Sequence, residues 1–293
     1  MPINLPVILL LFGSMLWGLT WIPLKYFDEQ GIAGVSVVLI AYGAVSLALL
    51  PLFVKQYAIW KKQQDYIWLI MFLGGFGNLA FATSLMYGDV VRVMVLFYLL
   101  PAWGVLGGRI FLKEHIDGKR WLAVGLALSG AFMVLGGFQI FETSASWVDF
   151  FALASGFTLA MNNIAFRATP KLPDASKISA MFVGGFIMAV LFMILLREPL
   201  PQGSVTNWAM VIAFGLFWIL VATLSTQWAV TRLEVGRASI IIIMELLTAV
   251  VSAMWIGDET LNNWEMVGGL MIIVAAVLES RRGKGSSEYE RPS

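Results

Sequence analysis

The chain has 293 residues, of which 59% are hydrophobic and only 13% charged, with a formal net charge of +1. A soluble domain usually carries about 25% charged residues, so this composition excludes an ordinary soluble protein, and the near-neutral charge gives no sign of nucleic-acid binding. Cysteine is absent and His115 is the only histidine. We therefore expect no disulfide framework, no bound metal and no cofactor.

Ten apolar runs follow one another along the chain, most of them close to the roughly 20 residues that a helix needs to cross a bilayer. They predict an all-α polytopic membrane protein with ten transmembrane helices. The first run lacks a basic leader and a cleavage site, so we interpret it as a retained helix. The runs lie near 5–25, 33–54, 66–87, 90–112, 119–138, 147–167, 178–196, 207–230, 236–256 and 264–281.

The basic residues orient these helices. With the N-terminus placed in the cytoplasm, every lysine and arginine falls in a cytoplasmic segment except Lys25, Arg92 and Arg197. Cytoplasmic loops of membrane proteins are rich in lysine and arginine, so we predict a multi-pass protein of the cell (inner) membrane with both termini in the cytoplasm. The polar tail 283–293 is expected to be disordered.

The sequence repeats itself weakly in its two halves. A shift of 145 residues places Asp89-Val-Val-Arg92 on Glu234-Val-Gly-Arg237 and Glu114 on Glu259. Each half holds five spans, an odd number, so the halves insert with opposite orientations, and such repeats build a site near the bilayer midplane. We predict two inverted five-helix repeats, which comprise residues 1–138 and 147–281.

Candidate binding residues begin in the first half. Trp17 and Trp21 are one turn apart on the first span and share a face, although tryptophan is also common at membrane interfaces. Asn78 is a polar residue on the third span. Tyr98 precedes Pro101 on the fourth span, and a proline inside a helix frees a carbonyl and bends the backbone, which is tolerated beside a cavity.

Polar residues recur in the second half. Asn162 and Asn163 are adjacent on the sixth span, so their side chains point about 100° apart, and we expect one to line the site and the other to pack between helices. Thr223 and Gln227 share a face of the eighth span, and Thr223 aligns with Asn78 in the repeat. Hydroxyl and amide groups in a membrane also serve as hydrogen bonds between helices, and both interpretations stay open for this pair.

Glu245 is a carboxylate in the middle of an apolar run. A charge at this depth costs at least about 2.5 kcal/mol and usually marks an ion or substrate route. Thr248 and Ser252 follow on the same helix face. We therefore predict that Glu245 binds substrate or couples transport to protons, with a neutral packing carboxyl as the alternative.

Two arginines are candidates for gating, Arg92 near the outer mouth and Arg237 near the inner mouth. Each lies three residues after an acid, Asp89 or Glu234. The alternative is a pair of ordinary ion pairs at helix starts, where an acid also suits the helix dipole.

These features resemble the EamA group of the drug/metabolite transporter superfamily. Leu100-Pro101-Ala102-Trp103, with its span closing at Lys113-Glu114, looks like the first-half pattern of that family, and Trp17-Gly18 resembles its Trp-Gly pair. Met244-Glu245-Leu246, with its span closing at Asp258-Glu259, resembles the second-half pattern, with leucine where relatives have proline. The resemblance implies an alternating-access carrier whose cavity is lined by spans 1, 3, 4, 6, 8 and 9. Because leucine replaces the proline, the resemblance does not imply that span 9 bends.

The predicted function is secondary transport of a small metabolite, with export inferred from the family alone. An amino acid or related zwitterion is the first candidate, because its ammonium group suits Glu245. A small organic cation held by the carboxylate and aromatic rings is the alternative. An intramembrane enzyme and a channel are alternatives from other classes. The sequence contains no His-Glu-x-x-His motif and no nucleophile–base pair for an enzyme, and no P-loop for direct use of ATP. The repeated, oppositely inserted halves favour a carrier over both alternatives. We expect no enzyme activity. The expected partners are a small-molecule substrate, protons and the lipid bilayer.

Overall fold

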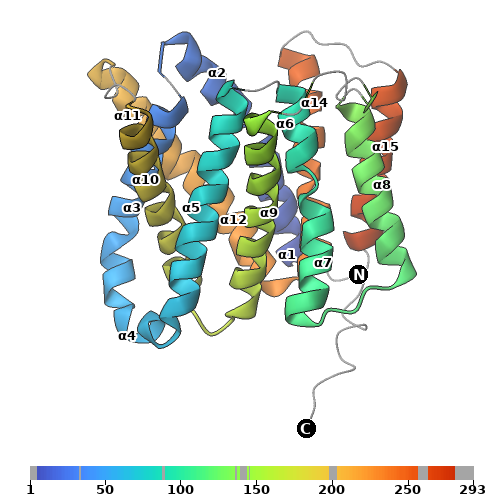
Figure 1. Cartoon of the computed structure of the whole chain (residues 1–293), viewed down its shortest axis with the longest axis horizontal. Coiled ribbons are helices and arrows are strands. Elements are labelled where there is room, and N and C mark those ends of the chain that lie inside the picture. Colours follow the sequence, from blue (N-terminus) through green and yellow to red (C-terminus); the bar gives the residue numbers. More distant parts are fainter. Residues whose placement is uncertain are drawn as a thin grey trace.

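A computed structural model describes residues 5–32, 34–87, 90–135, 137–138, 144, 146–197, 203–256 and 263–280. These residues form helices and no strand, and the helices stand side by side in one bundle (Figure 1). In the first half they are α1 (Leu5–Gly18), α2 (Trp21–Glu29), α3 (Gly34–Lys55), α4 (Tyr57–Trp60), η1 (Lys61–Gln63), α5 (Gln64–Tyr87), α6 (Val90–Phe97), α7 (Leu100–Leu112) and α8 (Gly118–Val134). In the second half they are α9 (Trp147–Ala168), α10 (Asp174–Leu196), α11 (Val205–Ala213), the π-helical segment η3 (Phe214–Ile219), α12 (Leu220–Arg232), α13 (Val235–Ile242), α14 (Met244–Ile256) and α15 (Asn263–Ser280).

The apolar character predicted from the sequence is confirmed. Six described helical stretches are long and apolar enough to cross a membrane, and Met266–Leu278 is a shorter apolar helix. The protein is therefore an all-α polytopic membrane protein, while the count of ten spans stays a prediction. The six stretches are Leu5–Glu29, Gly34–Lys55, Tyr57–Ser84, Val93–Leu112, Asp174–Leu195 and Val205–Arg232.

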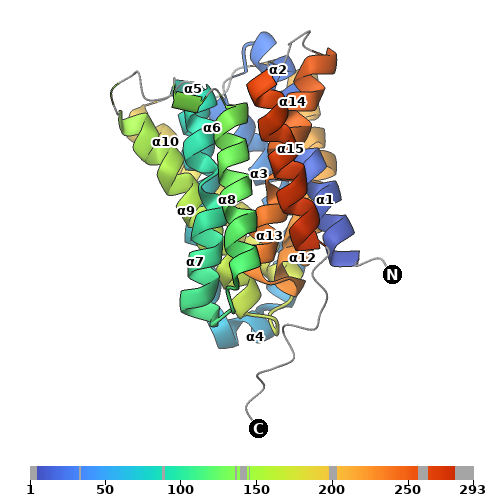
Figure 2. The same ribbon diagram turned by 90° about the vertical axis from the view of Figure 1, so that its right-hand side faces the viewer.

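Helices of the two halves pack directly against each other. α8 lies along α15, α3 along α10, and α5 along both α9 and α10, while α1 contacts α12 and α14. The side view shows α8 and α15 together on one face of the bundle, with α4 at its lower end (Figure 2). Gly130 and Gly268 allow α8 and α15 to approach closely, because a Cβ on either glycine would lie 2.6 Å from the carbonyl oxygen of the other. Small residues allow this contact between membrane helices.

Three pairs of consecutive helices are separated by short interruptions, two of them inside the long stretches Leu5–Glu29 and Val93–Leu112. α1 and α2 are separated at Leu19, and α6 and α7 at Tyr98. Pro23 and Pro101 explain these breaks, because a proline has no N–H to donate to the carbonyl four residues earlier. The break between α13 and α14 at Ile243 has no proline.

At Ile243 the backbone nevertheless leaves the α-helical hydrogen-bond pattern. The N–H of Leu246 donates to the carbonyl of Ile243, three residues back, at 3.0 Å. The stretch from α13 to α14 is therefore interrupted although residue 246 is leucine and not proline. The π-helical segment η3, between α11 and α12, is a fourth irregular stretch of the bundle, and π-helical turns are frequent at functional sites.

Candidate functional site

A cavity in the middle of the bundle lies beside all four irregular stretches. It has two adjoining chambers of about 100 and 160 Å³, and Trp17, Asn78, Phe81 and Glu245 belong to both. The smaller one, here called the amide chamber, is completed by Ser14, Phe97, Leu100, Leu159, Asn163, Met181, Thr223, Thr226, Gln227 and Ile242. The larger one, the aromatic chamber, is completed by Gly18, Thr20, Trp21, Leu24, Val37, Val38, Ala41, Tyr42, Ala82, Met94, Tyr98, Phe214, Ile219 and Ala249.

Glu245 lies where the two chambers meet, in the first turn of α14 directly after the break at Ile243. The hydroxyl of Tyr98, at the other break, is a hydrogen-bond partner of its carboxylate. Gly18 allows α1 to approach this point, since a Cβ there would lie 2.4 Å from the carbonyl oxygen of Glu245. The interruptions of three spans thus bring a carboxylate, a phenol and the Trp17-Gly18 pair together.

Aromatic side chains form one wall of the aromatic chamber. Trp21 donates from its ring nitrogen Nε1 to Ser252 Oγ at 2.9 Å and so ties α2 to α14. The Tyr42 hydroxyl donates to Asn78 Oδ1 at 2.9 Å. Both rings are therefore held in fixed orientations by polar groups of other helices. A ligand with a flat apolar part finds rigid, preorganised surfaces here.

The amide chamber contains polar atoms that lack partners. Gln227 Nε2 donates to Asn163 Oδ1 at 3.2 Å. Ser14 Oγ, Thr223 Oγ1 and Gln227 Oε1, in contrast, are buried without a hydrogen-bond partner among the described residues. A buried polar atom left without a partner costs about 1–3 kcal/mol. Three such atoms around one cavity could be completed by a polar ligand or by bound water.

Eight of the ten predicted binding residues line the cavity, and two do not. Asn162 is fully buried, and its Nδ2 atom lies 3.9 Å from Met181 Sδ, whereas Asn163 lines the amide chamber. This is the division expected for adjacent residues on a helix. Thr248 donates to the carbonyl of Met244 at 2.9 Å and packs against Gly18. It supports the wall of the site without belonging to it.

Of the two proposed gating residues, Arg237 does not line the cavity. Arg237 is buried in α13. Glu234 forms an ion pair with Arg120 of α8, a connection that the sequence did not indicate. The side chain of Arg92 lies outside the described part of the structure, as do Asp89, Asp258 and Glu259.

A polar cluster surrounds the residues that join α12 to α13, here called the α12–α13 corner (Thr231–Gly236). Arg167 Nη1 donates to the carbonyl of Thr231 at 2.8 Å. The Glu114 carboxylate accepts from the backbone N–H groups of Val235 and Gly236 at 2.8 and 3.3 Å. Other elements contribute three further contacts with the corner, from Arg120 to Glu234, from Asp174 to Arg232 and from Lys177 to Thr231.

Sequence reasoning missed several residues of the site. Ser14 lies one turn before Trp17 on the same helix face, so helical spacing would have identified it. Tyr42 and Phe81 stand in apolar runs that give no sign of which way they point. Trp218 donates to the Leu16 carbonyl at 3.1 Å and holds the first span close to its break, a contact that depends on the π-helical segment.

Comparison with known proteins agrees with this geometry. A central cavity beside interrupted membrane helices is the arrangement expected of a membrane transporter. The chain belongs to the EamA-like transporter family, whose model matches residues 4–136 and 146–281.

Individual relatives are distant. The riboflavin transporter of Vibrio cholerae serotype O1 is 26% identical over 217 residues, which are 70% of this chain and 67% of that protein. An uncharacterized transporter of Archaeoglobus fulgidus is 23% identical over 193 residues, which are 66% of this chain and 68% of that protein. A crystal structure of a protein with 14% identity has a TM-score of 0.76 and covers 93% of this chain and 95% of that chain. This last similarity concerns the fold alone.

Proposed function

We propose that the protein is a secondary transporter that carries a small metabolite through the central cavity by alternating access. The observation that carries the proposal is the cavity itself, whose walls come from both halves and surround unpartnered polar atoms. Interrupted helices at a binding site are typical of secondary transporters. The bends allow the two ends of a span to move separately while the site stays in place.

The two matched stretches, 4–136 and 146–281, support two repeated units that correspond to the repeats proposed from the sequence. Packing supports an inverted relation between them. Under the repeat, α1 corresponds to α9, and α12 to α5. α1 packs against α12 just as α9 packs against α5. We propose that the two units exchange roles when the cavity opens to the opposite side.

The lining residues favour a substrate that has a flat apolar part and lacks a strong negative charge. Among the described residues that line the two chambers, Glu245 is the only charged side chain, and no lysine or arginine faces the cavity. The ammonium group of an amino acid would suit Glu245, but its carboxylate would have only amide and hydroxyl donors. A small organic cation or a neutral heteroaromatic compound fits the aromatic chamber better.

Riboflavin is a specific candidate of the second kind. The support is the name of the Vibrio cholerae relative together with the aromatic wall, on which a flat ring system can stack. The unpartnered hydroxyl and amide atoms of the amide chamber suit a hydrogen-bonding side arm. Amino acids and organic cations stay as the other candidates.

A thermal-shift screen separates these candidates. The purified protein would be heated with riboflavin, choline, tryptamine, tryptophan or glutamate, since a ligand that binds only the folded state raises the melting temperature with concentration. We expect riboflavin or an amine to stabilise the protein more than glutamate. Uptake into liposomes that saturates and shows counterflow would then establish a carrier. Uptake that shows neither would contradict the proposal.

Orientation and direction are part of the same proposal. We propose that the protein lies in the inner membrane of the cell with both termini in the cytoplasm. We also propose that it transports its substrate outward. A reporter fused after Arg282 should then be cytoplasmic, and one inserted near Ser144 should be external. The opposite location at either position would contradict the proposed topology.

A further inference from the structure

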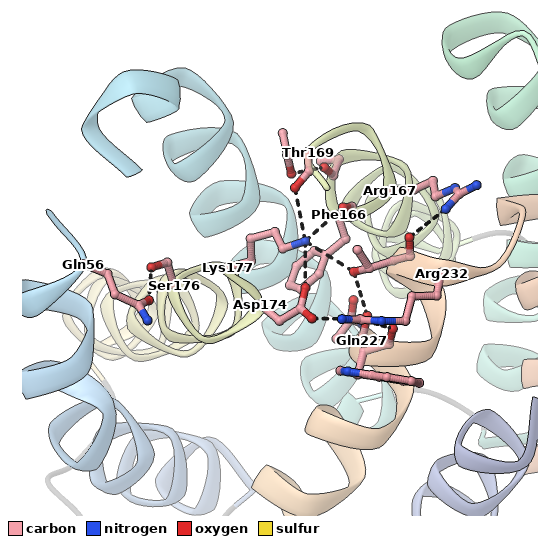
Figure 3. A network of polar contacts seen from close by, with 12 residues as sticks. Gln56, Phe166, Arg167, Thr169, Asp174, Ser176, Lys177, Gln227 and Arg232 are labelled. Atoms are coloured by element: carbon pink, nitrogen blue, oxygen red, sulfur yellow. Dashed lines mark hydrogen bonds and ion pairs between the residues drawn. The ribbon is translucent and has the colours of Figure 1, made fainter. Parts of the chain in front are cut away.

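Lys177, in the first turn of α10, is fully buried although it carries an ammonium group. Its Nζ atom is surrounded by oxygen atoms from three helical segments (Figure 3). The partners are Asp174 Oδ1 at 3.0 Å, the Phe166 carbonyl at 3.1 Å, Thr231 Oγ1 at 3.3 Å and the Thr169 carbonyl at 3.4 Å.

This set of oxygen atoms has the chemistry of a cation site. One carboxylate, one hydroxyl and two backbone carbonyls are the ligands that hard cations take in proteins. The two carbonyls belong to the last turn of α9 and to Thr169 just beyond it, where the helix dipole is negative. The ring of Phe166 lies 5.2 Å from Nζ and adds a further favourable surface for a cation.

The same ammonium group is connected to the amide chamber. Thr231 Oγ1, which accepts from Lys177, donates to the carbonyl of Gln227 at 2.9 Å. Gln227 in turn donates to Asn163, which lies on α9 one turn before Phe166. The cation therefore joins the last turns of the two helices that carry the Asn163–Gln227 pair.

We propose that the Lys177 ammonium group is a tethered cation in a site that would otherwise take an alkali metal or alkylammonium ion, and that this cation positions the Asn163–Gln227 pair. Phe166, Thr169, Asp174 and Thr231 form the site. The proposal rests on the proposed function only in treating the amide pair as part of a transport site. Lys177 itself is a positioning residue, because it does not line the cavity.

An ordinary buried ion pair is the competing interpretation. In that case the loss of Lys177 would destabilise the protein because Asp174 loses one of its partners, and no added cation would restore it. A cation site behaves differently once the tether is removed. A diffusible cation of suitable size would enter the vacated space and restore both stability and the position of α12.

Lys177→Ala tests this difference in the full-length protein. Its melting temperature would be measured in chloride salts of N-methyl-D-glucamine, potassium and methylammonium at equal ionic strength. In N-methyl-D-glucamine, whose cation is too large to enter, we expect a fall of roughly 10 °C relative to the unmodified protein. Methylammonium, which reproduces the lost group, should recover at least half of that fall, and potassium a smaller part.

Two further variants serve as controls. Lys177→Met has an apolar side chain of similar length, which leaves no room for an added cation. This variant should therefore be destabilised in all three salts, without recovery in methylammonium or potassium. Arg232→Ala removes the other cation bound to Asp174, at 2.8 Å, from a side chain that is 39% exposed. Because its site is open to solvent, this variant should show a small loss that does not depend on the salt.

Amide hydrogen exchange of peptides from α12 gives an independent measurement. In Lys177→Ala, exchange near Gln227 should be faster in N-methyl-D-glucamine and slow down again in methylammonium, while peptides from α8 should not change. Equal melting temperatures of Lys177→Ala in the three salts would overturn the proposal. So would a variant that folds in none of them, or a Lys177→Met protein as stable as the unmodified one. None of these outcomes depends on which substrate is carried.

Discussion

The amide chamber and the α12–α13 corner contain similar polar side chains but satisfy them differently. At the corner, charged and hydroxyl side chains have protein partners, several of them on other elements, as in the Glu114 carboxylate with two backbone N–H groups. In the amide chamber, Ser14, Thr223 and Gln227 keep polar atoms without a protein partner. Helix α12 connects the two regions, because Thr223 and Gln227 line the amide chamber and Thr231 belongs to the corner.

This difference indicates what each region does. A protein tolerates buried unpartnered groups where a ligand or water completes them, whereas a satisfied polar network fixes one arrangement of the chain. We therefore expect the amide chamber to act as a binding site and the corner to act as a structural junction. Substitutions in the first should change binding, and substitutions in the second should change stability.

The largest expected effect comes from Glu245. If its carboxylate binds protons during transport, Glu245→Gln should abolish proton-driven accumulation in liposomes, because an amide keeps the shape but does not ionise. Substrate counterflow should persist. Glu245→Ala should lose both, since it also removes the contact with Tyr98.

The measurement is the internal pH change that substrate causes in liposomes, recorded together with counterflow. Accumulation and pH change like those of the unmodified protein in Glu245→Gln would leave Glu245 as a packing carboxyl. Loss of counterflow as well would identify it as a direct substrate ligand instead.

A smaller effect is expected from the aromatic wall. Trp21→Ala should weaken ligand binding roughly tenfold, because a ring contact in a desolvated site contributes about 1–2 kcal/mol. Trp60 is the matched control, since it stacks on Phe53 with ring centres 4.7 Å apart in the α4 region, away from the cavity. Trp60→Ala should lower the melting temperature and leave the dissociation constant unchanged. Equal changes of the dissociation constant in both variants would remove Trp21 from the site.

Two threonines compare the regions directly. Thr223→Val removes a hydroxyl that has no protein partner, so the protein should keep its stability, while ligand affinity falls a few-fold, or about 1 kcal/mol. Thr231→Val removes a hydroxyl bonded to Gln227 and Lys177. Thr231→Val should therefore lower the free energy of unfolding by about 1–2 kcal/mol, which corresponds to a fall of several degrees in the melting temperature. Melting curves and binding isotherms of both variants provide the test, and the reverse assignment of effects would refute the comparison.

The sequence predicted the fold class because hydropathy and charge are properties of whole segments. Glu245 and Trp17 could be identified in the same way, since a carboxylate in an apolar run and the helical spacing of tryptophans are local signals. The sequence predicts that one of Asn162 and Asn163 lines a cavity but does not indicate which. Only their positions in the structure distinguish their roles.

Other features depend on contacts between distant segments. The sequence paired Glu234 with Arg237 by their spacing, but the ion pair between Glu234 and Arg120 joins elements 114 residues apart. The interruption at Ile243 arises without a proline, so no residue type announces it. The burial of Lys177 was equally hidden, because a lysine near the end of a predicted span is normally assigned to the cytoplasmic surface.

The smallest expected effect concerns Glu114 at the corner, outside the membrane-spanning segments. Burial raises the pKa of this carboxyl above its ordinary value, while the N–H groups of Val235 and Gly236 oppose the shift. A raised pKa means that the folded protein holds the proton more tightly than the unfolded chain. The stabilisation is therefore complete below the ordinary glutamate pKa of about 4.3 and is lost as the pH rises through the raised value.

Glu114→Gln cannot ionise and should lack this part of the pH dependence, while all other groups titrate alike in both proteins. The melting temperature of the unmodified protein, minus that of the variant, should thus decrease as the pH rises above about 4.3. Melting curves across this pH range measure the difference. A constant difference would show that Glu114 ionises equally well in the folded and unfolded chain, and the corner would then be held by its hydrogen bonds at every pH.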